Sequence, residues 1–103
     1  MYATTSLRDA YRKFRTENKD YLYAFGQGEF FVFVLGDANK VHELLPDVLV
    51  DESSVGYPAI RIHSAQIFQL IWRLSQKGQK VAMVSRSVNS KGKVKYSISD
   101  RYS

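Results

Sequence analysis

The N-terminal part of the chain has the hydrophobic pattern of an amphipathic helix. Apolar side chains recur at the i, i+3, i+4, i+7 spacing of one helical face, at Leu7, Ala10, Tyr11 and Phe14. Ser6 precedes them, and a serine oxygen at that position can accept hydrogen bonds from the free amides of a first helical turn. The pattern therefore predicts a helix that begins after Ser6 and fades near Asn18.

Two apolar segments with strand character follow this helix. Residues 21–25 form a short aromatic run, and the Gly-Gln-Gly of residues 26–28 predicts a turn after it. Residues 30–35 read Phe-Phe-Val-Phe-Val-Leu, in which both alternating sets of side chains are apolar. Because a strand that is apolar on both faces is usually covered on both sides, residues 30–35 are predicted to lie in the interior of a sheet.

The remaining sequence alternates between helix and strand patterns. Asp37 is the predicted N-cap of a second helix that Pro46 ends, and Ser64 is the predicted N-cap of a third helix that Gly78 ends. Short strands are predicted at residues 48–50, 60–62, 81–84 and 94–98, and residues 89–92 form a hairpin-like turn between the last two. This order predicts an α/β domain, with a mixed β-sheet flanked by about three helices.

The composition is that of one small domain without thiol chemistry. The chain has 103 residues, 45% hydrophobic and 14% aromatic, so residues 1–103 are expected to form a single domain. The absence of cysteine excludes a disulfide scaffold, thiol catalysis and a Cys-ligated zinc site. No apolar run approaches the about 20 residues of a membrane span, and the first residues do not have the form of a signal peptide. The expected location is the cytoplasm, with no membrane partner.

The sequence contains no recognisable catalytic or cofactor motif. It has no phosphate-binding Gly-Lys-Ser/Thr loop, no Gly-x-Ser-x-Gly element and no histidine ligand pair. The acidic pair Asp51-Glu52 could hold the metal of a nuclease, but such sites generally need several convergent carboxylates. His42 is expected on a helix surface, and His63 is expected in a turn or near a helix cap. The chain is therefore predicted to be a non-enzyme without a metal or another cofactor.

Positive charge is concentrated in the C-terminal part of the chain. The net charge is +5, yet residues 25–59 hold one basic and six acidic side chains, whereas residues 60–103 hold nine basic and one acidic. If the latter segment forms one surface, that surface can face phosphates. The candidate DNA contacts are Lys80, Arg86, Lys91, Lys93 and Lys95. The alternative for each of them is that it only keeps a small domain soluble.

Several motifs, in order, resemble the mismatch-recognition domain of the MutS family. That domain has a hydrophobic strand, then Gly-Asp-Phe-Tyr-Glu-Leu-Phe, then Asp-Ala and an amphipathic helix; the matching positions here are Gly28, Phe30, Asp37, Ala38, Leu44 and Leu45. Gly56 and Pro58 resemble the family's Gly-x-Pro loop. Residues 71–82 resemble its Leu-x-Arg-Leu-x-x-x-Gly-x-x-Val-Ala helix and strand. The resemblance covers about residues 6–86.

The resemblance implies a mixed α/β fold and binding to mismatched or bent double-stranded DNA. In that family a Phe-x-Glu element enters the minor groove, where the Phe stacks on an unpaired base and the Glu hydrogen-bonds to it. A mismatch lowers the cost of unstacking, so an aromatic wedge bends faulty DNA more easily than paired DNA. Phe30 occupies the wedge position, and Val32, which cannot accept a hydrogen bond, occupies the Glu position. Phe30 is therefore either a wedge or a core aromatic.

Two functions remain open at this stage. The first is a DNA-binding module related to mismatch repair, with Phe30 as the wedge and basic side chains on the DNA backbone. The second is a protein-interaction module that keeps the fold, binds other repair proteins and uses apolar Val32 to extend a contact patch. Joint exposure of Phe30 and Val32 favours a wedge or an interface, and joint burial favours a core role. Because the ATPase and clamp of complete MutS proteins do not fit in 103 residues, we expect a freestanding recognition domain or a fragment without its own ATPase.

Overall fold

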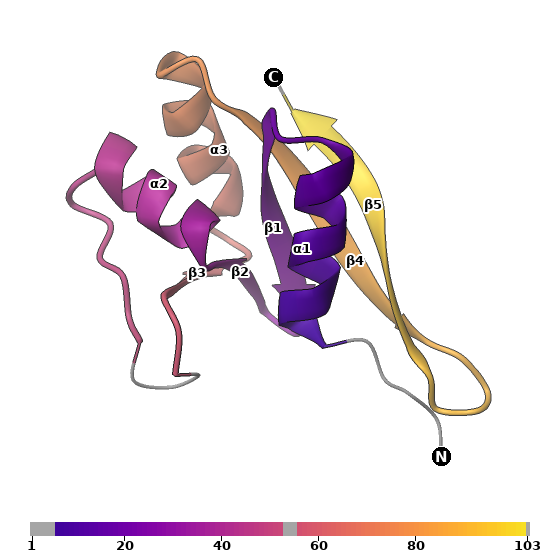
Figure 1. Cartoon of the computed structure of the whole chain (residues 1–103). Coiled ribbons are helices and arrows are strands. Elements are labelled where there is room, and N and C mark those ends of the chain that lie inside the picture. The colour runs from indigo at the N-terminus through magenta and orange to yellow at the C-terminus, as the bar shows by residue number, and fades with distance from the viewer. Residues whose placement is uncertain (1–5, 53–55, 103) are drawn as a thin grey trace.

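The sheet lies between one helix on one face and two helices on the other (Figure 1). The computed structural model describes residues 6–52 and 56–102, and within them three helices and five strands. The helices are α1 (Leu7–Glu17), α2 (Gly36–Leu44) and α3 (Ile67–Gln76). The strands are β1 (Tyr21–Gln27), β2 (Phe30–Val34), β3 (Ala59–His63), β4 (Lys80–Val88) and β5 (Val94–Tyr102).

The strand order is β3-β2-β1-β4-β5, and the sheet is mixed. Strands β1 and β4 are parallel, while the other neighbouring pairs are antiparallel. The predicted fold class is therefore confirmed. Of the predicted interior strand at residues 30–35, residues 30–34 form β2 between β3 and β1, and Leu35 is the N-cap of α2.

Each face of the sheet has its own apolar core. The α1-side core contains Ala10, Tyr11, Phe14, Tyr23, Phe25, Val32, Val34, Ala59, Ala82 and Val84. The α2/α3-side core contains Leu22, Ala24, Phe33, Ala38, Val41, Leu45, Ile60, Ile67, Leu70, Ile71, Leu74, Val81 and Met83. Because side chains alternate along a strand, β2 supplies Val32 and Val34 to one core and Phe33 to the other.

Two predicted helix ends are confirmed at the level of hydrogen bonds. The hydroxyl of Ser6 accepts from the backbone N–H of Asp9 at 3.1 Å, so α1 begins as predicted. At the end of α3, Gly78 has a φ of 77°, which brings the N–H of Gln79 to 3.0 Å from the carbonyl oxygen of Leu74. A glycine is favoured there because it adopts this left-handed conformation without a Cβ clash.

The predicted N-caps of the other two helices are wrong. Helix α2 begins at Gly36, and Asp37 lies inside its first turn, because the carboxylate instead accepts from the backbone N–H of Tyr23 in β1 at 2.8 Å. Helix α3 begins after Gln66. The backbone N–H of Ser64 donates to the carbonyl oxygen of Glu29, so Ser64 belongs to the connection from β3. At Asp37 a tertiary hydrogen bond thus replaces the predicted local one, whereas α3 has its N-cap two residues after Ser64.

The strand predicted at residues 48–50 is also wrong. Val48 and Val50 pack, partly buried, against the α2/α3-side core, and Leu49 is exposed. The backbone pairing nearby is a single bridge between Asp51 and Ala59. The apolar side chains of this segment therefore pack against the core without forming a strand. Short apolar runs commonly leave this ambiguity.

The two hairpins are longer than their patterns predict. Strand β1 continues through Gly26 to Gln27, which leaves Gly28 and Glu29 as the turn. Strand β4 pairs with β1 only as far as Val84 but with β5 as far as Val88. Residues 85–97, here called the hairpin arm, therefore extend beyond the three-layer part of the molecule (Figure 1).

Candidate nucleic-acid interface

Phe30 lies at the start of β2 as a partly exposed surface aromatic. Its direct cross-strand partner is His63 of β3, and the two ring centroids are 5.5 Å apart with the ring planes nearly perpendicular, at 82°. The guanidinium carbon of Arg61 lies 4.5 Å from the centroid of the Phe30 ring. The ring belongs to neither of the two cores, and both of these contacts are with polar residues of β3.

Val32 has the opposite environment. It is only 4% exposed and belongs to the α1-side core. The expectation that Val32 extends a surface contact patch is therefore wrong, because the sheet and α1 already cover it. Of the two positions that match the family's Phe-x-Glu element, Phe30 therefore lies at the surface and Val32 lies in the core.

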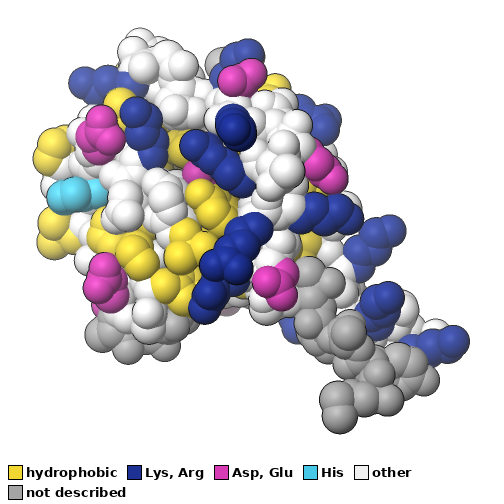
Figure 2. All heavy atoms as spheres, in the orientation of Figure 1, with side chains coloured by type: hydrophobic (Ala, Val, Ile, Leu, Met, Phe, Trp, Pro, Cys, Tyr) yellow, Lys and Arg dark blue, Asp and Glu magenta, His cyan; other side chains and the backbone are white. Residues whose placement is uncertain are grey.

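Four of the predicted basic contacts lie on the hairpin arm. Arg86, Lys91, Lys93 and Lys95 are all exposed, and Figure 2 shows Lys and Arg side chains along the projecting part of the molecule. Arg86 lies directly opposite Tyr96, and Lys95 lies opposite Ser87, one position along the ladder. Because successive strand positions face opposite sides, the arm carries positive charge on both of its faces.

The tip of the arm has a defined conformation. The side-chain oxygen of Asn89 accepts from the backbone N–H groups of Lys91 and Lys93, each at 2.9 Å. Gly92 has a φ of 77°, and a Cβ built there would meet nothing within 4 Å. Asn89 therefore organises the backbone of the turn while the lysine side chains stay free to contact a ligand.

A groove of about 560 Å³ separates the hairpin arm from α1. Phe14, Val94 and Tyr96 contribute apolar surface to its lining, and Lys13, Lys93 and Lys95 contribute positive charge. The contacts predicted from the sequence included no residue of α1, so they missed that Lys13 lies next to the arm. Part of this surface could have been recognised from the sequence, because the polar face of the helix carries several basic side chains.

Lys80 lies apart from these residues. It begins β4, and its ammonium nitrogen lies 5.9 Å from the ring centroid of Tyr21. Arg86 follows roughly 20 Å further along the same strand. The structure therefore brings together four of the five predicted basic contacts, and it separates Lys80 from them by most of a strand.

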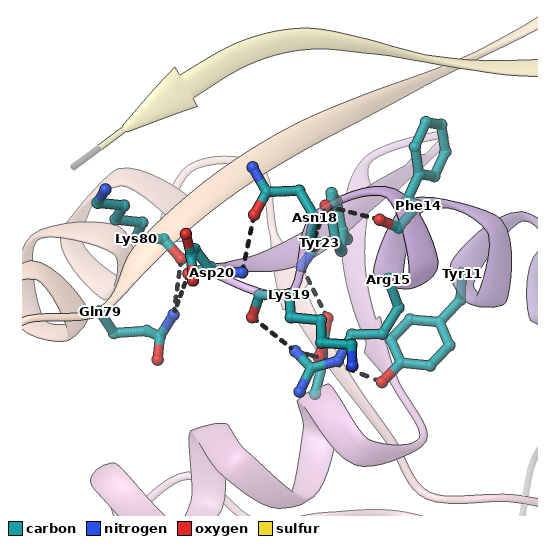
Figure 3. Close-up of polar contacts among 10 residues, drawn as sticks. Tyr11, Phe14, Arg15, Asn18, Lys19, Asp20, Tyr23, Gln79 and Lys80 are labelled. Carbon is teal, nitrogen blue, oxygen red and sulfur yellow. Dashed lines mark hydrogen bonds and ion pairs between the residues drawn. The ribbon is translucent and has the colours of Figure 1, made fainter.

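Asp37 is the centre of a buried polar cluster. Its partners Tyr11, Arg15 and Tyr23 are labelled in Figure 3. It accepts hydrogen bonds from the Tyr23 backbone N–H at 2.8 Å and from the Tyr11 hydroxyl at 3.3 Å. Arg15 lies 3.6 Å away. Burial raises the pKa of Asp37 to about 6, although the hydrogen bond from Tyr23 and the charge of Arg15 oppose the rise. Asp37 is 1% exposed, and its hydrogen bonds join α2 to β1 and α1.

The two histidines have local partners. The Nδ1 atom of His42 lies 2.7 Å from the carbonyl oxygen of Val48, and the Nδ1 atom of His63 accepts from the backbone N–H of Ala65 at 3.1 Å. Among residues 6–52 and 56–102, no group of three or more His, Cys, Asp or Glu side chains is arranged to hold a metal ion. None of the helices in the same ranges combines the length and the apolar character needed to cross a membrane.

Comparison with known proteins assigns the family. The pattern of MutS domain I matches residues 5–103, so it includes the hairpin arm as well as the segments around Phe30 and α3. The chain matches no protein of curated function. The match covers nearly the whole chain, and the mixed sheet with helices on both faces agrees with the fold that the motifs implied. The chain therefore belongs to the MutS domain I family, a non-catalytic DNA-binding module of mismatch repair.

Proposed function

We propose that residues 1–103 act as one domain that binds mismatched or bent double-stranded DNA, without an ATPase of its own. The observation that carries the proposal is the position of Phe30, which is partly exposed and outside both cores. An aromatic ring at the surface can enter a base step that a mismatch has already weakened, because less stacking energy is then lost. Phe30 is the proposed wedge.

The hairpin arm is the proposed contact to the DNA backbone. Arg86, Lys91, Lys93 and Lys95 project from it, and such side chains fix the position of a protein on a duplex without reading its sequence. Lys80 is a proposed outlying contact, which a duplex reaches only by extending along β4. With few phosphate contacts, binding is expected to be weak and to fall as salt rises, with a slope of log K against log salt of about −0.9 per contact.

The test is binding to matched, mismatched and single-base-loop duplexes at two salt concentrations. We expect the wild-type chain to prefer the mismatched and looped duplexes, and Phe30→Ala to remove that preference. Lys93→Gln should weaken binding to all duplexes alike and reduce the slope of log K against log salt by about 0.9. No binding to any duplex at low salt would contradict the proposal.

Phe68→Ala is the matched control for Phe30→Ala. Phe68 is a 58% exposed aromatic on α3, whose core residues pack on the opposite face of the sheet from the Phe30 side. If Phe68→Ala lowers mismatch preference as much as Phe30→Ala does, the effect is not specific to the wedge position.

An exposed aromatic pair supports a second candidate function, binding to another repair protein. Phe68 and Trp72, one helical turn apart on α3, are 58% and 62% exposed. Tyr102 contacts Phe68 edge to face, with ring centroids 5.9 Å apart. Large apolar side chains that gather on a surface often mark protein contacts. Trp72 is the only tryptophan in the chain, so a repair protein that covers α3 should shift its fluorescence to shorter wavelength, whereas DNA bound at Phe30 should not.

A further inference from the structure

The register of β2 against β3 gives Phe30 polar neighbours that the sequence pattern does not reveal. Phe30 lies opposite His63, and Val32 lies opposite Arg61. Directly opposed residues of an antiparallel pair point to the same face of a sheet. Arg61 therefore lies beside the position at which the family pattern has its glutamate, on the face that carries Phe30.

Both neighbours present hydrogen-bond donors. The guanidinium of Arg61 is donor-only and lies 4.5 Å from the centre of the Phe30 ring. In His63, Nδ1 accepts from the backbone N–H of Ala65, so the neutral ring carries its proton on Nε2. Val32 is buried and apolar, so the polar groups nearest the wedge come from β3 and are donors where the family pattern has an acceptor.

We propose that Arg61 is the base-reading side chain of this module, an inference that rests on the proposed role of Phe30 as the wedge. The guanidinium of Arg61 lies over the Phe30 ring, so a base that stacks there displaces it towards the edge of the ring. From that position the guanidinium can donate to the minor-groove edge of the stacked base. In the minor groove the O2 atom of pyrimidines and the N3 atom of purines are acceptors, whereas the exocyclic amino group of guanine is a donor. The module therefore favours mismatches and unpaired bases that present acceptors in the minor groove, and guanine opposes binding.

Inosine provides the sharpest test, because it is guanine without the minor-groove amino group. Duplexes that contain a G·T or an I·T mismatch in the same context differ only by that group. We expect the wild-type chain to bind the I·T duplex about tenfold more tightly. Arg61→Met keeps a long side chain on the Phe30 ring but removes the donors, so the ratio of the two affinities should approach one. Arg61→Glu should reverse the preference.

Arg101→Met is the charge-matched control. Arg101 is an exposed arginine on β5, at the opposite edge of the sheet from β3. Its loss removes the same charge, so it can change both affinities but should leave their ratio at the wild-type value. Arg61→Lys is a second variant that keeps the charge without the planar donor fork, and it should lower the ratio. Thermal unfolding of each variant checks that the fold is retained, as expected for an exposed side chain.

The outcomes separate this inference from the function on which it rests. If Arg61→Met keeps the wild-type ratio while Phe30→Ala loses mismatch preference, the role of Arg61 is overturned and the wedge stands. If the wild-type chain binds the G·T and I·T duplexes equally, the proposed base-reading role of Arg61 is likewise overturned. If the wild-type chain binds no duplex at low salt, the proposed function fails, and the role of Arg61 fails with it.

Discussion

At the scale of single residues, the chemistry of this chain depends on which side chains the sheet buries. Val32 and Asp37 are both buried, one as an apolar core residue and the other as a hydrogen-bonded carboxylate. Phe30 is two positions from Val32 on the same strand yet lies at the surface, because β2 begins there and the core does not extend to its first residue. Single substitutions at these positions should therefore have quite different effects.

Asp37 predicts a specific pH dependence of stability. Its pKa rises from 3.8 to about 6 on folding, so the folded state holds the proton more tightly than the unfolded state does. This contribution to stability is present in full below about pH 4 and is lost as the pH rises through about 6, which amounts to about 3 kcal/mol.

Asp37→Asn should remove that dependence, because the amide keeps an acceptor oxygen but does not ionise. The measurement is the free energy of unfolding of both proteins between pH 4 and pH 7 in urea. We expect the difference between variant and wild type to change across this range in favour of the variant at the higher pH. Parallel curves would contradict the assignment to Asp37.

Val32→Glu, which restores the family pattern, should destabilise the chain without restoring base reading. The position is 4% exposed in the α1-side core, so a carboxylate there loses hydration, and we expect a loss of about 2–4 kcal/mol in the free energy of unfolding. Val32→Thr, which keeps the shape, should cost less. A Val32→Glu variant that is as stable as wild type and gains mismatch preference would show that this position reaches the surface.

At the scale of elements, the hairpin arm is held mainly by its own ladder. Beyond Val84, β4 has lost its pairing with β1, and only β5 continues beside it. The tip depends on Asn89 and on the left-handed conformation of Gly92. An arm built in this way can present several charges to a duplex without disturbing the two cores.

Gly92→Ala should therefore loosen the arm and little else. Since there is space for the methyl group, the cost is the strained backbone alone, about 1 kcal/mol. We expect faster amide hydrogen exchange in residues 88–94 and unchanged exchange in β1 and β2. Gly28→Ala is the matched control, because Gly28 also has space and a positive φ, of 63°, but lies in the β1–β2 turn. Faster amide exchange across the whole sheet in Gly92→Ala would contradict the view that the arm is held mainly by its own β4–β5 pairing.

At the scale of the whole molecule, the basic side chains are grouped in space differently from their grouping along the sequence. The C-terminal basic residues do not form one patch, because Lys80 and the hairpin arm lie at opposite ends of β4. Lys13 of α1, distant in sequence, instead lines the same groove as Lys93 and Lys95. The positive surface that a duplex would meet therefore combines two segments of the chain.

Three charge-neutralising variants test this arrangement. We expect Lys13→Gln and Lys93→Gln to weaken duplex binding by similar factors, and Lys80→Gln to weaken it less, because a duplex on the arm reaches Lys80 only along β4. The measurement is affinity for one duplex over a series of salt concentrations. Equal losses for Lys80→Gln and Lys93→Gln would indicate that the duplex lies along the sheet.

The sequence by itself determined what depends on neighbouring residues. Three local patterns predicted elements that the structure contains. They are the 3.6-residue spacing from Leu7 to Phe14, the run of residues 30–35 that is apolar on both faces, and the glycine after α3. Motif order was enough to indicate the family and to mark Phe30. These features are local, so a single segment carries the whole signal.

Only the tertiary structure decided what depends on register and packing. Asp37 looked like a helix cap until β1 supplied the N–H of Tyr23, and Lys80 looked like part of a basic surface until β4 placed it at the far end. Arg61 lies beside Phe30 because β3 pairs with β2 in one register, and a shift by one residue would turn it to the other face. Such pairings join segments that are distant in sequence, and no local pattern of apolar and polar residues encodes them.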